Sequence, residues 1–171
     1  MAKARPIEGL HAELPFAEAA ALTVEVRAAE VFAHAGRALE TEDIKPVHDM
    51  RVATRRLRAV LEIYAACFPE RELKSVVKDV KALADALGAR RDPDVQLEDL
   101  AAFAAAMDPA DGPGIELFGA RLRGQQAAGN AILAAGLEAI AENDLEARLA
   151  LLVADARGTV AEPETVDGEP A

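Results

Sequence analysis

Basic side chains are concentrated in one segment of an otherwise acidic chain. Residues 47–58, VHDMRVATRRLR, contain one histidine and four arginines. If this segment is helical, its apolar residues share one side, because residues three or four apart lie on the same face of a helix. The opposite side then carries His48, Arg51, Arg55 and Arg58, with Arg56 on the flank. Guanidinium groups bind phosphate oxygens through two parallel hydrogen bonds, so this pattern predicts a site for an anion.

A second basic stripe follows on the next predicted helix. Its members recur opposite an apolar side and are Arg71, Lys74, Lys78 and Lys81. Residues 45–91 hold eleven Lys and Arg against six Asp and Glu, a local net charge of +5 in a chain whose net charge is −11. Like charges four residues apart, such as Arg51 and Arg55, oppose helix formation. A bound anion that offsets this repulsion would explain the pattern, whereas a merely solvated face usually mixes both signs of charge.

The ladder of charges fits a polymer of repeated phosphates better than a single phosphate group. Proteins that bind single-stranded nucleic acid add aromatic side chains on which the bases stack. This chain has no Trp, and its one Tyr, Tyr64, falls on the apolar side of the predicted helix. The sequence therefore predicts a partner that is a phosphate polyanion, and nucleic acid is the poorer match.

The composition predicts an all-α fold that positions the two stripes. Hydrophobic residues make up 51% of the chain and aromatic residues only 4%, which favours helices that pack through small side chains. The short loops predict an antiparallel up-and-down bundle of about five to six helices. Proline and glycine place these helices at residues 16–40, 46–68, 70–87, 95–107 and 115–142, with a short sixth helix ending near residue 158.

The positions of proline and glycine, together with the acidic composition of the last residues, also predict the domain boundaries. We expect a flexible N-terminus at residues 1–15, one helical domain at residues 16–158, and a disordered acidic tail at residues 159–171. Within the domain, Gly88 is predicted to end the third helix. The residues predicted to face the core from the first helix are Leu22, Val26, Ala29 and Ala33.

Nothing in the sequence indicates a catalytic centre, a cofactor or a metal site. The three histidines lack metal-ligand spacing, and Cys67 is the only cysteine, so neither a zinc site nor an intrachain disulfide is expected. No glycine-rich phosphate loop or nucleophile motif occurs. We therefore expect a protein that is not an enzyme. No run is apolar enough to span a bilayer, and no signal peptide is evident, which predicts a cytoplasmic location.

Two segments resemble the signatures of one helical family. HDMRVATRRLRAVLEIYAACFP resembles the hallmark helix of the CHAD family, the conserved-histidine α-helical domain, of the form H-x-x-R-V-x-x-R-R-L-R. LGARRDPDVQLEDL resembles the second signature, L-G-x-x-R-D-x-D-V, and the resemblance spans about residues 16–157. It implies a helical bundle that binds inorganic polyphosphate in a basic groove without catalysis and associates with polyphosphate granules. The phosphate contacts that it implies are His48, Arg51, Arg55, Arg56, Arg58, Lys74, Lys78, Lys81 and Arg91. Asp92 and Asp94, which also match the second signature, are expected to cap the fourth helix or to hold an arginine.

The chain departs from this family in one respect. Its members usually have two related halves, each with a histidine–arginine helix, and the groove lies between them. This sequence has no histidine after His48 and only four Lys or Arg after Gly112. It therefore predicts either a short form or a homodimer in which each copy supplies one basic wall.

Two other functions stay open from the sequence alone. A histidine on a helical bundle can accept a phosphoryl group in a phosphorelay, although the arginines around His48 exceed what that chemistry requires. The basic stripes can also be the outer faces of a helical scaffold or protein-interaction module.

Overall fold

The described part of the chain folds into five α-helices joined by short connections. The computed structural model describes residues 3–160, which contain no strand. The helices are α1 (Phe16–Phe32), α2 (Lys45–Ile63), α3 (Glu70–Ala104), α4 (Gly112–Glu142) and α5 (Leu145–Val160). The all-α prediction is confirmed. Most of the tail predicted at residues 159–171 lies outside the described residues.

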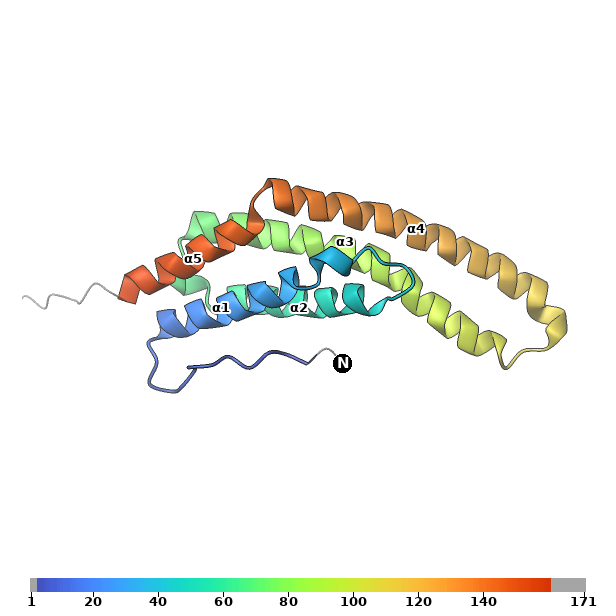
Figure 1. Ribbon diagram of the computed structural model, residues 1–171, viewed down its shortest axis with the longest axis horizontal. Helices are drawn as coiled ribbons and strands as arrows, with labels where there is room; N and C mark the ends of the chain where they lie inside the picture. Colours follow the sequence, from blue (N-terminus) through green and yellow to red (C-terminus); the bar gives the residue numbers. More distant parts are fainter. Residues whose placement is uncertain (1–2, 161–171) are drawn as a thin grey trace, which may run out of the picture.

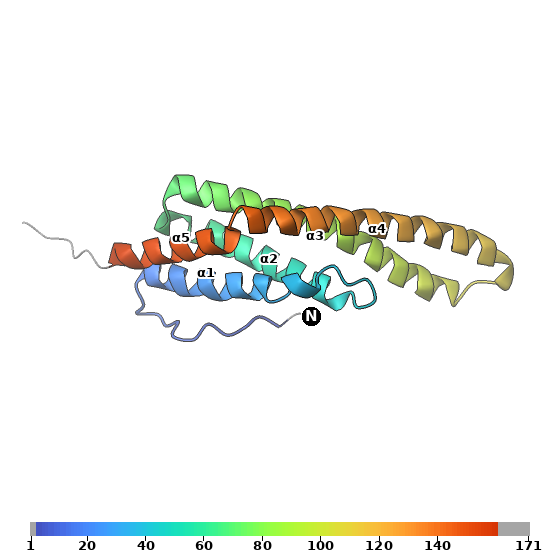
Figure 2. The same cartoon turned by 45° about the horizontal axis from the view of Figure 1, so that its top comes forward.

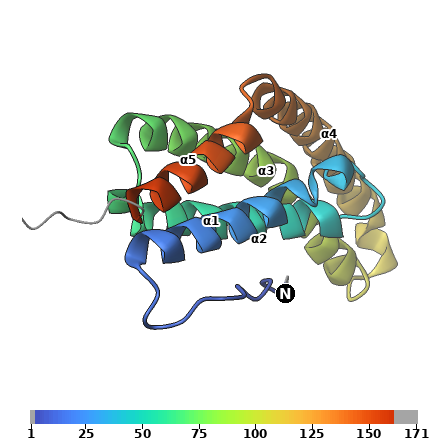
Figure 3. The ribbon, with the colours of Figure 1, turned by 60° about the vertical axis from the view of Figure 1, so that its left-hand side comes forward.

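Four helices surround one core, and a hairpin projects beyond it. Figure 3 shows α1, α2, α5 and the first half of α3 around a common interior, with α4 on the outside of α3. Neighbouring helices in this bundle run antiparallel, and α5 continues the direction of α4 after a bend at residues 143–144 (Figure 1). The second half of α3 and the first half of α4 extend past the other helices (Figure 2). We call this two-helix extension, residues 93–126, the arm.

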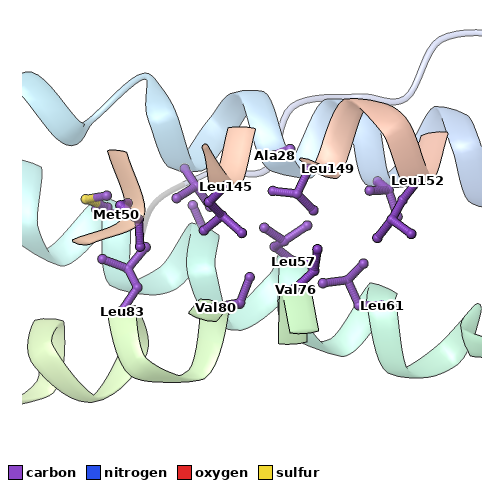
Figure 4. Close-up of a cluster of buried hydrophobic side chains, with 14 of the residues drawn as sticks. Ala28, Met50, Leu57, Leu61, Val76, Val80, Leu83, Leu145, Leu149 and Leu152 are labelled. Carbon is purple, nitrogen blue, oxygen red and sulfur yellow. The ribbon is translucent and has the colours of Figure 1, made fainter. Parts of the chain in front are cut away.

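The core consists mainly of leucine, valine and alanine, and Met50, Phe68 and Ile140 complete it. Its fully buried members include Leu57, Leu61, Leu145, Leu149 and Leu152, and burial of each large aliphatic side chain contributes about 1.5–3 kcal/mol. In Figure 4, Met50 of α2 lies against Leu83 of α3, and Leu57 lies near Val76. These contacts fix the antiparallel register of the two helices that carry the basic stripes.

The core-facing side of α1 differs from the prediction. Its buried apolar residues include Ala20, Val24 and Val31, whereas Ala29 and Ala33 are exposed and Leu22 and Val26 are half-buried. The prediction was wrong because small apolar residues surround this helix, so that its periodicity selects no single face. The segment before α1 also covers part of the predicted face, since Gly9 lies against the Leu22 side chain. The helix ends at Phe32, before a 3₁₀ turn at Ala35–Arg37.

The predicted turn at residues 88–94 is absent, because α3 continues for 35 residues through both Gly88 and Pro93. Glycine costs only about 1 kcal/mol in a helix interior. Pro93 lacks the amide hydrogen that would bond to the carbonyl oxygen of Ala89, four residues earlier. Gly129 of α4 packs on that same carbonyl: a Cβ atom at Gly129 would lie 2.4 Å from the Ala89 oxygen. Packing between α3 and α4 therefore overrides the local signals that predicted two helices.

Replacement of Gly129 by alanine will destabilise the fold. The added methyl group would meet the Ala89 carbonyl and the Arg90 Cα, which lies 2.9 Å away, and such overpacking costs about 1–3 kcal/mol. The matched control is Gly124→Ala in the same helix, where nothing lies within 4 Å of the new methyl group. That control is expected to stabilise the protein by up to about 1 kcal/mol. Urea unfolding followed by circular dichroism measures the free energy of unfolding of both variants. If both substitutions changed this free energy in the same direction, the close contact of Gly129 with Ala89 would be wrong.

Candidate functional site

The outer side of α2 carries the first basic stripe. Arg51, Arg55 and Arg58 are exposed, and His48 is half-buried. Met50, Leu57 and Leu61 are buried on the opposite side of the same helix. The separation of apolar and basic sides is the one that the periodicity predicts.

The second stripe lies beside the first. Its residues, Arg71, Lys74, Lys78 and Lys81, are all exposed on α3. Because Met50 lies against Leu83 and Leu57 near Val76, the antiparallel register brings three pairs of cations to matching levels along the bundle. The pairs are Arg58 with Lys74, Arg55 with Lys78, and Arg51 with Lys81. We call this surface the basic face; it comprises His48, Arg51, Arg55 and Arg58 of α2 and Arg71, Lys74, Lys78 and Lys81 of α3.

Most cations of the basic face have no carboxylate partner. Arg58 bonds to Glu62 at 2.9 Å and Lys74 bonds to Glu70 at 2.5 Å. The members that form no ion pair with any residue in the described part of the chain are Arg51, Arg55, Arg71, Lys78 and Lys81. The positive charge predicted here is therefore largely uncompensated by the residues that the structure describes.

Arg56 lies on a different side of α2 from the basic face. It is half-buried and lines a cavity of about 290 Å³ between α1, α2 and the N-terminal segment. The other basic residues that line this cavity are Lys3, Arg5, His34 and Lys45, and its carboxylates are Glu30 and Asp49. No helical periodicity links the N-terminal residues to the motif, so this cluster could not be predicted from the pattern of residues.

Two carboxylates offset part of the positive charge in that cavity. Burial, the largest single influence, would raise the pKa of Glu30, but the Arg5 amide, the Arg27 guanidinium and the charge of Arg56 together hold that pKa below its ordinary value. Asp49 accepts a hydrogen bond from Lys45 and so raises the pKa of the Lys45 ammonium. The charge of Arg56 therefore interacts with Glu30 of α1 and helps to hold α2 against α1. Arg56 lies apart from the cations of the basic face.

The second signature forms a buried polar network within α3. Arg90, fully buried, is ion-paired with Asp94. Its Nε donates to Asn130 Oδ1 at 3.0 Å, and its Nη2 donates to the Glu40 carbonyl at 3.3 Å. Gln126 of α4 also donates to Asp94, at 2.7 Å. This network joins α3, α4 and the connection that precedes α2.

The expectation that Asp92 and Asp94 cap a helix is wrong, because both lie inside α3. The alternative, that an aspartate holds an arginine, is correct for Asp94. Its partner is Arg90, which motif matching did not single out, although the four-residue spacing of the two charges could have indicated it. Arg91, the candidate phosphate contact, has a side chain only 15% exposed and lies 3.4 Å from Glu98.

The described residues offer no metal centre. Within residues 3–160, no group of three or more His, Cys, Asp and Glu side chains could hold a metal ion. Burial raises the pKa of the Cys67 thiol, which lowers its reactivity as a nucleophile. None of the helices in this range is long and apolar enough to cross a bilayer.

The fold and the site define a helical bundle with positive charge concentrated on one helical hairpin, most of it without an ion-pair partner among the described residues. The family model for the CHAD domain matches residues 23–169, and the chain belongs to the CHAD domain family. This is a family of polyphosphate-binding domains. A search of curated proteins and a search of solved structures each return no match.

Proposed function

We propose that this protein binds inorganic polyphosphate, or a similar phosphate polyanion, on its basic face without catalysing a reaction. The observation that carries this proposal is a set of five cations on two adjoining helices that form no ion pair with any residue between 3 and 160. Uncompensated like charges at helical spacing weaken the helices that hold them, and a polyanion would remove that repulsion. In the cell, the proposal implies association with polyphosphate granules, and it includes a second copy of the chain as the source of an opposite basic wall.

The geometry favours a linear polymer with closely spaced charges. Arg51 and Arg58 are seven residues apart, which is about 10 Å along a helix, and cations of α3 stand at matching levels. Arginine contributes bidentate contacts and lysine contributes mobile point charges. His48 lies in the first turn of α2, where the helix dipole also favours anions.

Nucleic acid suits this surface less well. Base stacking requires exposed aromatic rings next to the cations. Tyr64 is half-buried and packs on Phe16, with ring centroids 5.0 Å apart. The basic face contains no Phe, Tyr or Trp, so the surface offers charge without the large aromatic rings on which bases stack.

Titration with long-chain polyphosphate tests the proposal. Binding should weaken steeply as salt rises from about 50 to 200 mM, because each neutralised phosphate releases counterions. Orthophosphate should show no measurable binding, and single-stranded DNA of equal total charge should bind at least about tenfold more weakly. Equal affinity for DNA and polyphosphate, or affinity that does not respond to salt, would contradict the proposal.

A further inference from the structure

The arm exposes a concentrated apolar surface. Of the eleven large apolar side chains that are exposed among the described residues, five lie within its residues 93–126. They are Val95, Phe103, Met107, Leu117 and Phe118. Phe103 is 53% exposed and Phe118 is 49% exposed, and both line a cleft of about 400 Å³ with Leu100, Gln96 and Asp99. Two rings left in water beside a cleft indicate an interaction surface.

This surface continues along α4 without acidic residues. Phe118, Gln125 and Ile132 are exposed and seven residues apart, which is the spacing of a helix–helix seam. No charged residue occurs between Arg123 and Glu138. A long helix that is apolar on its outer side as well as its inner side is normally covered by another helix.

The same side of α3 carries both the apolar patch and the lysines of the basic face. Phe103 follows Lys74, Lys78 and Lys81 by about eight, seven and six helical turns, so all four lie along one line of α3. A partner seated on Phe103 would therefore extend along this line towards the basic face.

Charged residues at the two edges of the patch identify the partner. Gln126 bonds to Asp94, and Leu100 lies against Gly119, a register that brings Asp99 of α3 level with Arg121 of α4. Both are exposed, and neither forms an ion pair with a described residue. One edge of the patch is thus negative and the other is positive.

We infer that a second copy of this chain docks on the arm, with the two arms side by side and pointing the same way. In that arrangement α3 of one copy packs on α4 of the other, and each Asp99 faces Arg121 of the second copy. If the arms pointed in opposite directions, α3 would pack on α3, and Asp99 would face Asp99. The charges therefore select the first arrangement, which is a closed two-fold pair.

This pairing places the two basic faces on either side of one seam. Because α3 of each copy lies opposite α4 of the other, the lysines of both α3 helices line the seam from opposite copies, and an anion bound there could contact both sets. Polyphosphate bound in the seam would hold the pair together, and by linkage the pair would bind polyphosphate more tightly than one copy does. This coupling rests on the proposed function, whereas the contact through the arm does not.

Sedimentation velocity with and without short-chain polyphosphate tests the inference. The wild type should form a dimer, and polyphosphate should strengthen it. Asp99→Arg and Arg121→Asp should each weaken self-association at least tenfold, and the double exchange D99R/R121D should restore it. Phe103→Glu should give a monomer, whereas Leu151→Glu, at an apolar residue of α5 that is 63% exposed, should not.

The outcomes separate the interface from the proposed function. A wild type that binds polyphosphate but stays a monomer at every concentration overturns the interface and leaves the function standing. A wild type that dimerises through Phe103 without binding polyphosphate supports the interface and overturns the function. If D99R/R121D stays as weak as either single variant, the side-by-side arrangement is wrong.

Discussion

Arg51→Gln combined with Arg55→Gln will reduce the affinity for long-chain polyphosphate by about ten- to a hundredfold. Both guanidinium groups are exposed and form no ion pair within the described residues, so they are available to the polymer. This loss corresponds to about 0.7–1.4 kcal/mol for each arginine, which lies between the contribution of an exposed ion pair and that of a hydrogen bond to a charged group. The slope of log affinity against log salt concentration should also become shallower by roughly two, one for each cation removed. Isothermal titration at several salt concentrations measures both quantities.

A charge-matched control separates local contact from net charge. Arg37→Gln with Arg157→Gln also removes two positive charges, but Arg37 pairs with Glu40 and Asp43, and Arg157 pairs with Glu18 and Glu25. These arginines lie outside the basic face. The control should change the affinity by less than about twofold and leave the salt slope unchanged. If both double variants lose affinity equally, polyphosphate responds to total charge and the basic face is not its site.

The parts of the fold that were predictable are those whose amphipathic pattern is strong. On α2, charged and apolar residues alternate with helical period, so its buried side followed from the sequence. On α1, alanine and valine surround the helix, and the choice of face depends on which neighbours pack there. The continuation of α3 through Pro93 depends on Gly129, which is 36 residues further along the chain. Local signals contain no information about such a contact.

The candidate site likewise has features that the sequence predicts and features that depend on packing. Periodicity placed Arg51, Arg55 and the lysines of α3 on outer surfaces, but it could not show which of them lack a carboxylate neighbour. That property depends on side-chain reach and on the register between α2 and α3. Arg56 matched the family motif equally well, yet it faces α1 because one residue of offset turns a side chain about 100° around a helix. A motif thus identifies the helix, and packing decides which of its residues face the ligand.

Arg90→Met will cost about 3–5 kcal/mol of folding free energy. The variant leaves the Asp94 carboxylate without its cationic partner in a site where the side chain is fully buried, and an uncompensated buried charge is among the most destabilising changes in a protein. It also removes the bonds from Arg90 to Asn130 and to the Glu40 carbonyl. Urea unfolding followed by circular dichroism measures the loss.

Two further variants show whether the cost comes from the unpaired charge. Arg90→Met combined with Asp94→Leu removes both charges, and such paired replacement is often neutral or stabilising; it should recover most of the lost stability. Asp92→Asn removes an exposed carboxylate in the same helix and should change stability by less than about 0.5 kcal/mol. If the double variant is as unstable as Arg90→Met alone, the stabilisation instead comes from the arginine's bonds to Asn130 and Glu40. Asp94 would then act mainly to orient Arg90 towards the connection before α2, and the second signature would support the basic face by positioning that helix.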